Sequence, residues 1–225
     1  MIGTTSNNLR NTIYLPLGLI IVFLVFFSTN LMAKDGFIVF KSEKGALIVW
    51  NASKAHFTVE VPGTSFKHVQ MEGIALLVDG HLVQVLLANP ADFSNPKDPP
   101  QTILLKYRDW ETKYREKLLN HELVPKIIDD ELGTKTDVVL WEITMPGDLT
   151  KRLNPDPNSN YAVKNLWATR VVGDLVVVIS FPVLKEDSEE EDLSLFHDIS
   201  NSIKTYDKPL DPTKIQKDLR KKRNR

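Results

Sequence analysis

The residues that could do chemistry in this sequence are scattered, and the familiar motifs are incomplete. His121-Glu122 begins like the helix of a zinc protease, but Pro125 occupies the position of the second histidine. The sequence contains no glycine-rich phosphate loop, dinucleotide fingerprint or nucleophile elbow. We therefore predict no cofactor, no metal motif and no catalytic residue, although a catalytic group without a local motif would leave no signal.

A second incomplete motif lies in a polar stretch near residue 158. Asp156, Asn158 and Asn160 have the spacing of the first three ligands of a calcium loop. Tyr161 stands where that loop needs glycine, and Trp167 stands where it needs a bidentate glutamate. We interpret the stretch as a turn-rich loop.

The five histidines are separated in the sequence. His81 follows an Asp-Gly turn, whereas His68 precedes the first strand of the same hairpin. The pairing of such a hairpin keeps these two positions apart. We expect each histidine to be a surface residue or a satisfied polar residue.

An acidic run precedes the last apolar pattern of the chain, from Glu186 to Asp192. Within it, Ser188 and Glu191 have the spacing of a capping box, and acidic residues are favourable at the positive end of a helix. We interpret the run as a helix start. Contact with a cation or a partner is the alternative.

The C-terminus is basic, although the chain as a whole has a net charge of −1. Residues 207–225 hold eight basic and three acidic residues, a net charge of 8 − 3 = +5. We predict a flexible basic tail that is solvated or that docks on an anionic surface, namely lipid headgroups, a polysaccharide or the acidic body of the protein. Nucleic acid is an unlikely partner for an exported domain. The candidate contacts are Lys217, Arg220, Lys221, Lys222, Arg223 and Arg225.

An unbroken apolar run, Ile13–Phe27, lies near the N-terminus. Its fifteen residues suit the core of a signal peptide, with cleavage after Ala33. The uncharged window around it is also long enough to span a bilayer, so residues 1–33 could form a permanent hydrophobic helical anchor. We expect export to a periplasmic or extracellular location, soluble after cleavage or anchored in the cytoplasmic membrane. Lysines that follow the run leave a cytoplasmic body as an alternative.

The remaining chain predicts one domain over residues 34–206. It has no cysteine, so no disulfide can stabilise it. Two hairpins are indicated, Ile74–Val78 with Leu82–Leu87 and Val163–Val172 with Leu175–Val183. Residues Val176–Ile179 are apolar at every position, so we expect this strand to be central and covered on both faces.

Two helices are expected to pack on these strands. Apolar residues recur at helical spacing from Ile103 to Leu118, which predicts a helix over residues 100–120. We place its Glu111/Arg115 pair on the solvated face. A second amphipathic pattern begins at Leu193. The order of strands, helix, strands and helix predicts an α+β sandwich with a mainly antiparallel sheet.

At this level the chain resembles the Mog1/PsbP-like fold. The resemblance covers roughly residues 55–206 and lies in the alternating strand His56–Pro62, the long middle helix, the strands after it, and a closing helix that ends with Ser202–Tyr206. It is a likeness of element order, and it implies no site residues. The resemblance implies a small binding or assembly protein.

Three functions remain open from the sequence. The first is an exported, non-catalytic binding or assembly module, which Ile13–Phe27 would tether to a membrane if it is uncleaved. The second is an exported hydrolase with a site built from the two longest loops, 89–101 and 146–160. The third is a membrane-anchored subunit with a cytoplasmic body.

Overall fold

The structure is a computed structural model that describes residues 36–52, 55–71, 73–128, 138–153 and 160–223. The predicted apolar segment Ile13–Phe27 lies outside these residues. Among the helices that are described, none has the length and apolar character needed to cross a bilayer.

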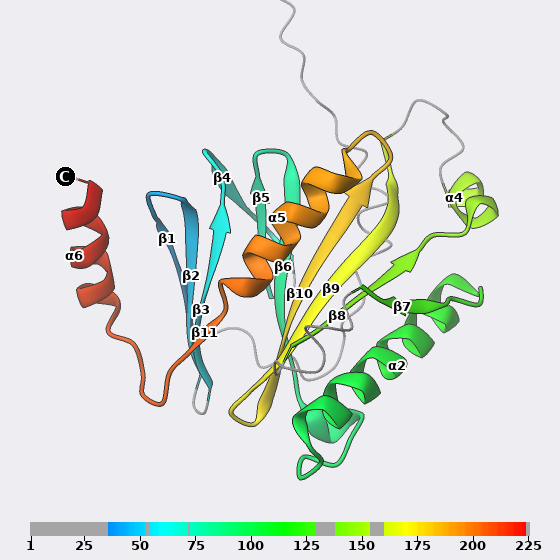
Figure 1. Cartoon of the computed structure of the whole chain (residues 1–225), viewed down its shortest axis with the longest axis horizontal. Helices are drawn as coiled ribbons and strands as arrows, with labels where there is room; N and C mark the ends of the chain where they lie inside the picture. Colours follow the sequence, from blue (N-terminus) through cyan, green and yellow to red (C-terminus); the bar gives the residue numbers. More distant parts are fainter. Residues whose placement is uncertain (1–35, 53–54, 72, 129–137, 154–159, 224–225) are drawn as a thin grey trace, which may run out of the picture.

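The described strands pair antiparallel in two sheets (Figure 1). The smaller sheet contains, in spatial order, β1 (Phe37–Lys41), β2 (Gly45–Ala52), β3 (Ala55–Pro62) and β11 (Lys204–Thr205). The larger sheet contains, in spatial order, β4 (Phe66–Val69), β5 (Ile74–Val78), β6 (His81–Ala88), β10 (Leu175–Leu184), β9 (Ala162–Val172), β8 (Val138–Thr144) and β7 (Pro125–Ile127). The predicted α+β class is confirmed, but the division of the strands into two sheets was not predicted.

The described helices are α2 (Pro100–Leu119), α4 (Gly147–Leu153), α5 (Glu189–Asn201) and α6 (Pro212–Arg223), and a short 3-10 helix, η1, covers Pro90–Asp92. Helices α5 and α2 lie on opposite faces of the larger sheet, whereas α6 lies beyond β1 (Figure 1). Helix α5 and the smaller sheet pack on one face of the larger sheet, and α2 packs on the other face. The two predicted packing helices are therefore confirmed.

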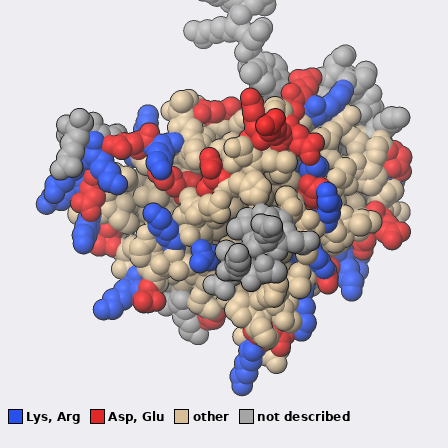
Figure 2. Space-filling model, viewed as in Figure 1, with Lys and Arg blue, Asp and Glu red and all other residues tan. Residues whose placement is uncertain are grey.

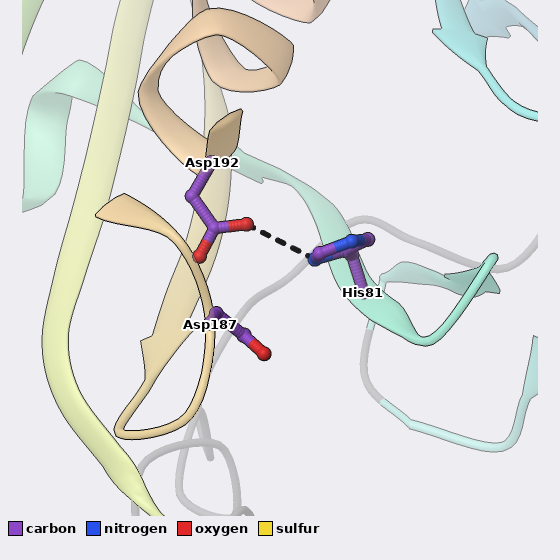
Figure 3. A group of neighbouring side chains, drawn as sticks. All are labelled: His81, Asp187 and Asp192. Carbon is purple, nitrogen blue, oxygen red and sulfur yellow. Dashed lines mark ion pairs between the residues drawn. The ribbon is translucent and has the colours of Figure 1, made fainter. Parts of the chain in front are cut away.

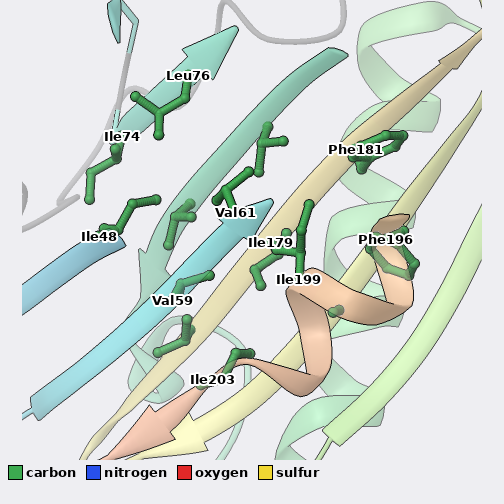
Figure 4. Close-up of a cluster of buried hydrophobic side chains, with 14 of the residues drawn as sticks. Ile48, Val59, Val61, Ile74, Leu76, Ile179, Phe181, Phe196, Ile199 and Ile203 are labelled. Atoms are coloured by element: carbon green, nitrogen blue, oxygen red, sulfur yellow. The ribbon is translucent and has the colours of Figure 1, made fainter. Parts of the chain in front are cut away.

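Strand β10 lies in the middle of the larger sheet, as its apolar sequence predicted. Val177 and Ile179 face the core formed with the smaller sheet and α5 (Figure 4). Val176 and Val178 face the second core, beneath α2. Side chains alternate between the faces of a strand, so a run of successive apolar residues is expected where both faces are covered.

The turn between β5 and β6 confirms the first predicted hairpin. Asp79 and Gly80 have φ angles of 49° and 101°, the left-handed region that the Asp-Gly pair favours. The Asp79 carboxylate accepts hydrogen bonds of 2.6–2.9 Å from the backbone and hydroxyl groups of Thr64 and Ser65. These bonds connect the turn to the segment before β4 and set where β6 begins.

The buried face of α2 differs from the prediction. Glu111 and Arg115 were expected in solvent, yet both are buried, and Arg115 Nε donates to Glu111 Oε1 at 2.6 Å. The Arg115 guanidinium also lies 4.9 Å from the ring centre of Trp167 on β9. The pair can be buried because each charge has an opposite partner and the aromatic face adds a cation–π contact. Leu118, which was expected on the buried face, is exposed.

Candidate functional site

A cluster of polar side chains lies where β6, the end of β10 and the start of α5 meet. We call it the polar cluster; it consists of His81, Asp187 and Asp192 (Figure 3). One potential ligand atom from each residue lies within 4.8 Å of those of the other two. His81 Nδ1 is 3.1 Å from Asp192 Oδ1. The cluster therefore brings together one imidazole and two carboxylates that are far apart in the sequence.

The Asp-Gly turn positions His81. His81 is the first residue of β6 and pairs with Val78 across the hairpin. Its ring stacks on Phe181 of β10, with ring centres 5.9 Å apart and planes 18° apart. The turn and this aromatic contact together hold the imidazole against the start of α5.

The turn from β10 into α5 positions both carboxylates. The backbone N–H of Leu184 donates to Asp187 Oδ2 at 3.2 Å, and the N–H of Asp187 donates to the Leu184 carbonyl. Ser188 caps α5, with its hydroxyl oxygen accepting from the Glu191 N–H at 3.4 Å, as the capping-box spacing predicted. Asp192 follows in the first turn of the helix. The acidic run is thus a helix start that also faces a histidine.

Asp192 is an unusual carboxylate. It is 1% exposed, and neither of its oxygens has a hydrogen-bond partner among the described residues. His81 lies at ion-pair distance but is not aligned as a hydrogen bond. Burial, followed by the charge of Asp187, raises the pKa of Asp192 to about 6, and His81 opposes this shift.

The predicted basic tail contains a helix that the sequence analysis did not expect. Helix α6 carries six basic residues and one acidic residue, a net charge of 6 − 1 = +5. Its apolar residues Pro212, Ile215 and Leu219 are half-buried and share one face. The exposed basic side chains are Lys214, Lys217, Arg220, Lys221 and Lys222. Arg223 ends the helix, and Arg225 lies outside the described residues.

Asn51 connects the segment before α6 to the body of the protein, and Asp211 caps the helix. The side-chain amide of Asn51 donates to the Leu210 carbonyl at 2.8 Å, and its oxygen accepts from the Leu210 N–H at 2.9 Å. Asp211 Oδ1 accepts from the N–H groups of Thr213 and Lys214. The helix therefore begins two residues after Leu210, which is bonded to Asn51 of β2.

Acidic and basic side chains gather on different parts of the surface. Acidic side chains gather over the start of α5, and basic side chains gather along the edge where α6 lies (Figure 2). Helix α6 lies beyond β1, at the edge of the smaller sheet (Figure 1). Helix α5, which carries Asp192 of the polar cluster, lies over the larger sheet. We treat α6 and the polar cluster as two separate candidate sites.

Local sequence signals differ between these two sites. The Asp211-Pro212 pair is a helix-start signal, because aspartate is a good cap and proline is tolerated in the first turn. The Asp211-Pro212 pair could therefore have predicted the start of α6. The turn and the capping box were recognised, but no local signal places His81 beside Asp192.

The described parts of the two long loops do not form one site. The 89–101 loop leads into the first residue of α2, and Phe93 packs on Tyr107 and Trp110. The 146–160 segment was expected to be a loop but contains α4, and Arg152 from α4 donates to the carbonyl of Leu119 at the other end of α2. A helix of 20 residues is about 30 Å long, so the described parts of the two loops lie near opposite ends of α2.

The other sequence motifs have limited structural support. His121 lies beyond the last residue of α2, so it cannot begin a metal-binding helix there. Asp156 and Asn158 of the incomplete calcium loop lie outside the described residues. His68 and His81 are separated by β5 and stack on Phe37 and Phe181, respectively, in agreement with their predicted separation.

Comparison with solved structures finds a fold match to the solution structure of cyanobacterial PsbP (CyanoP) from Synechocystis sp. PCC 6803. The match has a TM-score of 0.36 and 13% sequence identity, and it covers 80% of this chain and 98% of the other. Family models and curated proteins give no match. This is a weak PsbP-like fold match.

Proposed function

We propose that this protein is an exported, non-catalytic binding module that docks through α6 onto an anionic lipid membrane. The observation that carries the proposal is the basic helix itself. Its exposed positive side chains project into solvent, whereas its apolar residues are half-buried. Leu210, two residues before the helix, is bonded to Asn51 of β2. A helix places these charges together more firmly than a flexible tail would.

A lipid surface fits this charge pattern better than a small ligand. A row of exposed cations is suited to a broad anionic surface, and each lysine or arginine near such a surface contributes about 1 kcal/mol. The apolar run Ile13–Phe27 supports the same partner, because it directs the chain to a membrane whether it is cleaved or retained.

Vesicle binding tests the proposal. Residues 34–225 are suitable because both hydrophobic cores are built after residue 36. The test variant replaces Lys217, Arg220, Lys221 and Lys222 with glutamine. We expect binding to vesicles rich in phosphatidylserine to fall by about a hundredfold or more at low salt. Vesicles of phosphatidylcholine should bind neither protein.

A matched control tests whether vesicle binding depends on the position of the basic residues or only on the net charge of the protein. Glutamine replaces four other exposed lysines, Lys67, Lys97, Lys113 and Lys126. This control has the same net charge as the test variant and should keep most of the vesicle binding. Equal losses in the two variants would contradict the role of α6.

The direction of export is tested separately. A reporter that is active only outside the cytoplasm, fused after Arg225, should be active. Activity of a cytoplasm-only reporter at the same position would establish the cytoplasmic-body alternative.

A further inference from the structure

The polar cluster combines features that the fold alone does not require. His81, Asp187 and Asp192 come from a strand start, a turn and the first turn of a helix. These elements carry them to one place, with the His81 ring held by Phe181 and the Asp187 carboxylate held by the Leu184 N–H. Asp192 and His81 point toward each other, and Asp187 lies beside them (Figure 3).

We propose that His81, Asp187 and Asp192 bind a divalent transition-metal ion, with Zn²⁺ as its test case. This site goes beyond the proposed membrane docking and uses none of the residues of α6.

The spacing of the donor atoms supports the site. Zinc binds histidine nitrogen and carboxylate oxygen at about 2.0–2.2 Å, so tetrahedral ligands lie about 3.4 Å apart. His81 Nδ1 and Asp192 Oδ1 are already 3.1 Å apart, and the third ligand atom lies within 4.8 Å of both. Small rotations of the Asp187 side chain would complete a three-ligand set.

The buried carboxylate is an independent observation. Asp192 is 1% exposed and aimed at His81, but its oxygens have no hydrogen bonds among the described residues. Burial of a carboxylate without such bonds is costly, and native proteins rarely leave one in that condition. A cation between the three side chains would supply the missing partner.

The donor set selects the class of metal. Imidazole suits zinc, copper, nickel and iron, whereas calcium and magnesium prefer oxygen ligands in larger numbers. Three protein ligands also leave a coordination position for water or for a group from a partner. We therefore expect Zn²⁺ to bind in the presence of millimolar Ca²⁺ and Mg²⁺.

The test measures Zn²⁺ binding to the full chain in detergent, without a polyhistidine tag, by competition with a chromophoric chelator. We expect one ion per chain. The His81→Ala, Asp187→Asn and Asp192→Asn variants should each bind at least about tenfold more weakly, the scale expected when the coordination of a metal is disturbed. Asp198→Asn is the matched control, because Asp198 is an exposed aspartate of the same helix, and it should bind as the parent does.

Nuclear magnetic resonance gives a readout that does not depend on the variants folding. One equivalent of Zn²⁺ should shift the imidazole signals of His81 and leave those of His56, His68, His121 and His197 in place. Absence of stoichiometric binding, or unchanged His81 signals, would overturn the proposal. Equal weakening by Asp198→Asn would overturn it as well.

Discussion

The two candidate sites use charge in opposite ways. The basic side chains of α6 lie in solvent, where water and salt surround each charge. Asp192 lies out of solvent, and only His81 and Asp187 face it within the polar cluster. Exposed charges act over a distance and are screened by salt, whereas buried charges act at contact and require a specific partner. The contrast fits the two proposals, a broad anionic surface as the partner of α6 and a single ion as the partner of the polar cluster.

A third charged region sharpens the contrast. Glu111 is as buried as Asp192, but it has a permanent cation, Arg115, at 2.6 Å. Arg115 is in turn covered by Trp167. The Glu111/Arg115 pair is therefore complete within the fold, although Glu111 Oε2 has no hydrogen bond among the described residues. The Asp192 carboxylate has no such built-in cation.

The largest expected loss of stability follows from removing Arg115, the cation that pairs with Glu111. Arg115→Met leaves Glu111 buried without its partner, and breaking a buried pair in this way costs about 3–5 kcal/mol. Chemical denaturation should show this loss in the free energy of unfolding. The double variant Glu111→Gln/Arg115→Met should recover most of it. A loss below about 1 kcal/mol in the single variant would contradict the buried pairing.

A smaller effect is expected at the turn that positions His81. Hydrogen bonds from Thr64 and Ser65, led by the Thr64 backbone N–H, hold the pKa of Asp79 well below its ordinary value of 3.8. A lowered folded-state pKa adds stability above the ordinary value, and this stability is lost as the pH falls below it. Asp79→Asn should therefore lower the melting temperature at pH 7.

The pH dependence provides the control for this turn. Asparagine tolerates the positive φ of residue 79, so the variant tests the charge and not the backbone. The difference in melting temperature between parent and variant should shrink as the pH falls below about 3.8. A difference that is constant from pH 7 to pH 3 would contradict the role of the carboxylate.

The smallest effect is expected at Asp192. Its carboxylate makes no hydrogen bond among the described residues, so Asp192→Asn removes a buried charge without removing such a bond. We expect the free energy of unfolding, measured with a metal chelator at pH 7, to be unchanged or higher. A loss of more than about 1 kcal/mol would show that the carboxylate already has an adequate partner within the protein.

Local patterns predicted much of this fold. The Asp79-Gly80 turn placed the first hairpin, and the apolar run Val176–Ile179 identified the central strand. The bounds of α2 were also close to those predicted. Each of these features depends on neighbouring residues, which is why a single sequence contains the signal.

Features that depend on distant contacts were not predicted. Glu111 and Arg115 lie on the buried face of α2, where Arg115 contacts Trp167 of β9. Their charges alone had predicted that both side chains lie in solvent. His81 and Asp192 meet because β6 is paired with β10, which leads into α5. Separate turn and cap signals do not contain that pairing.

The most direct test of the account is the salt dependence of vesicle binding by residues 34–225. The screening length falls from about 10 Å at 0.1 M salt to about 3 Å at 1 M, so binding through α6 should weaken steeply over this range. Zn²⁺ binding by the same protein should change little, because its ligands act at contact. Vesicle binding that is strong at low salt and unchanged at 1 M would contradict electrostatic docking through the basic helix.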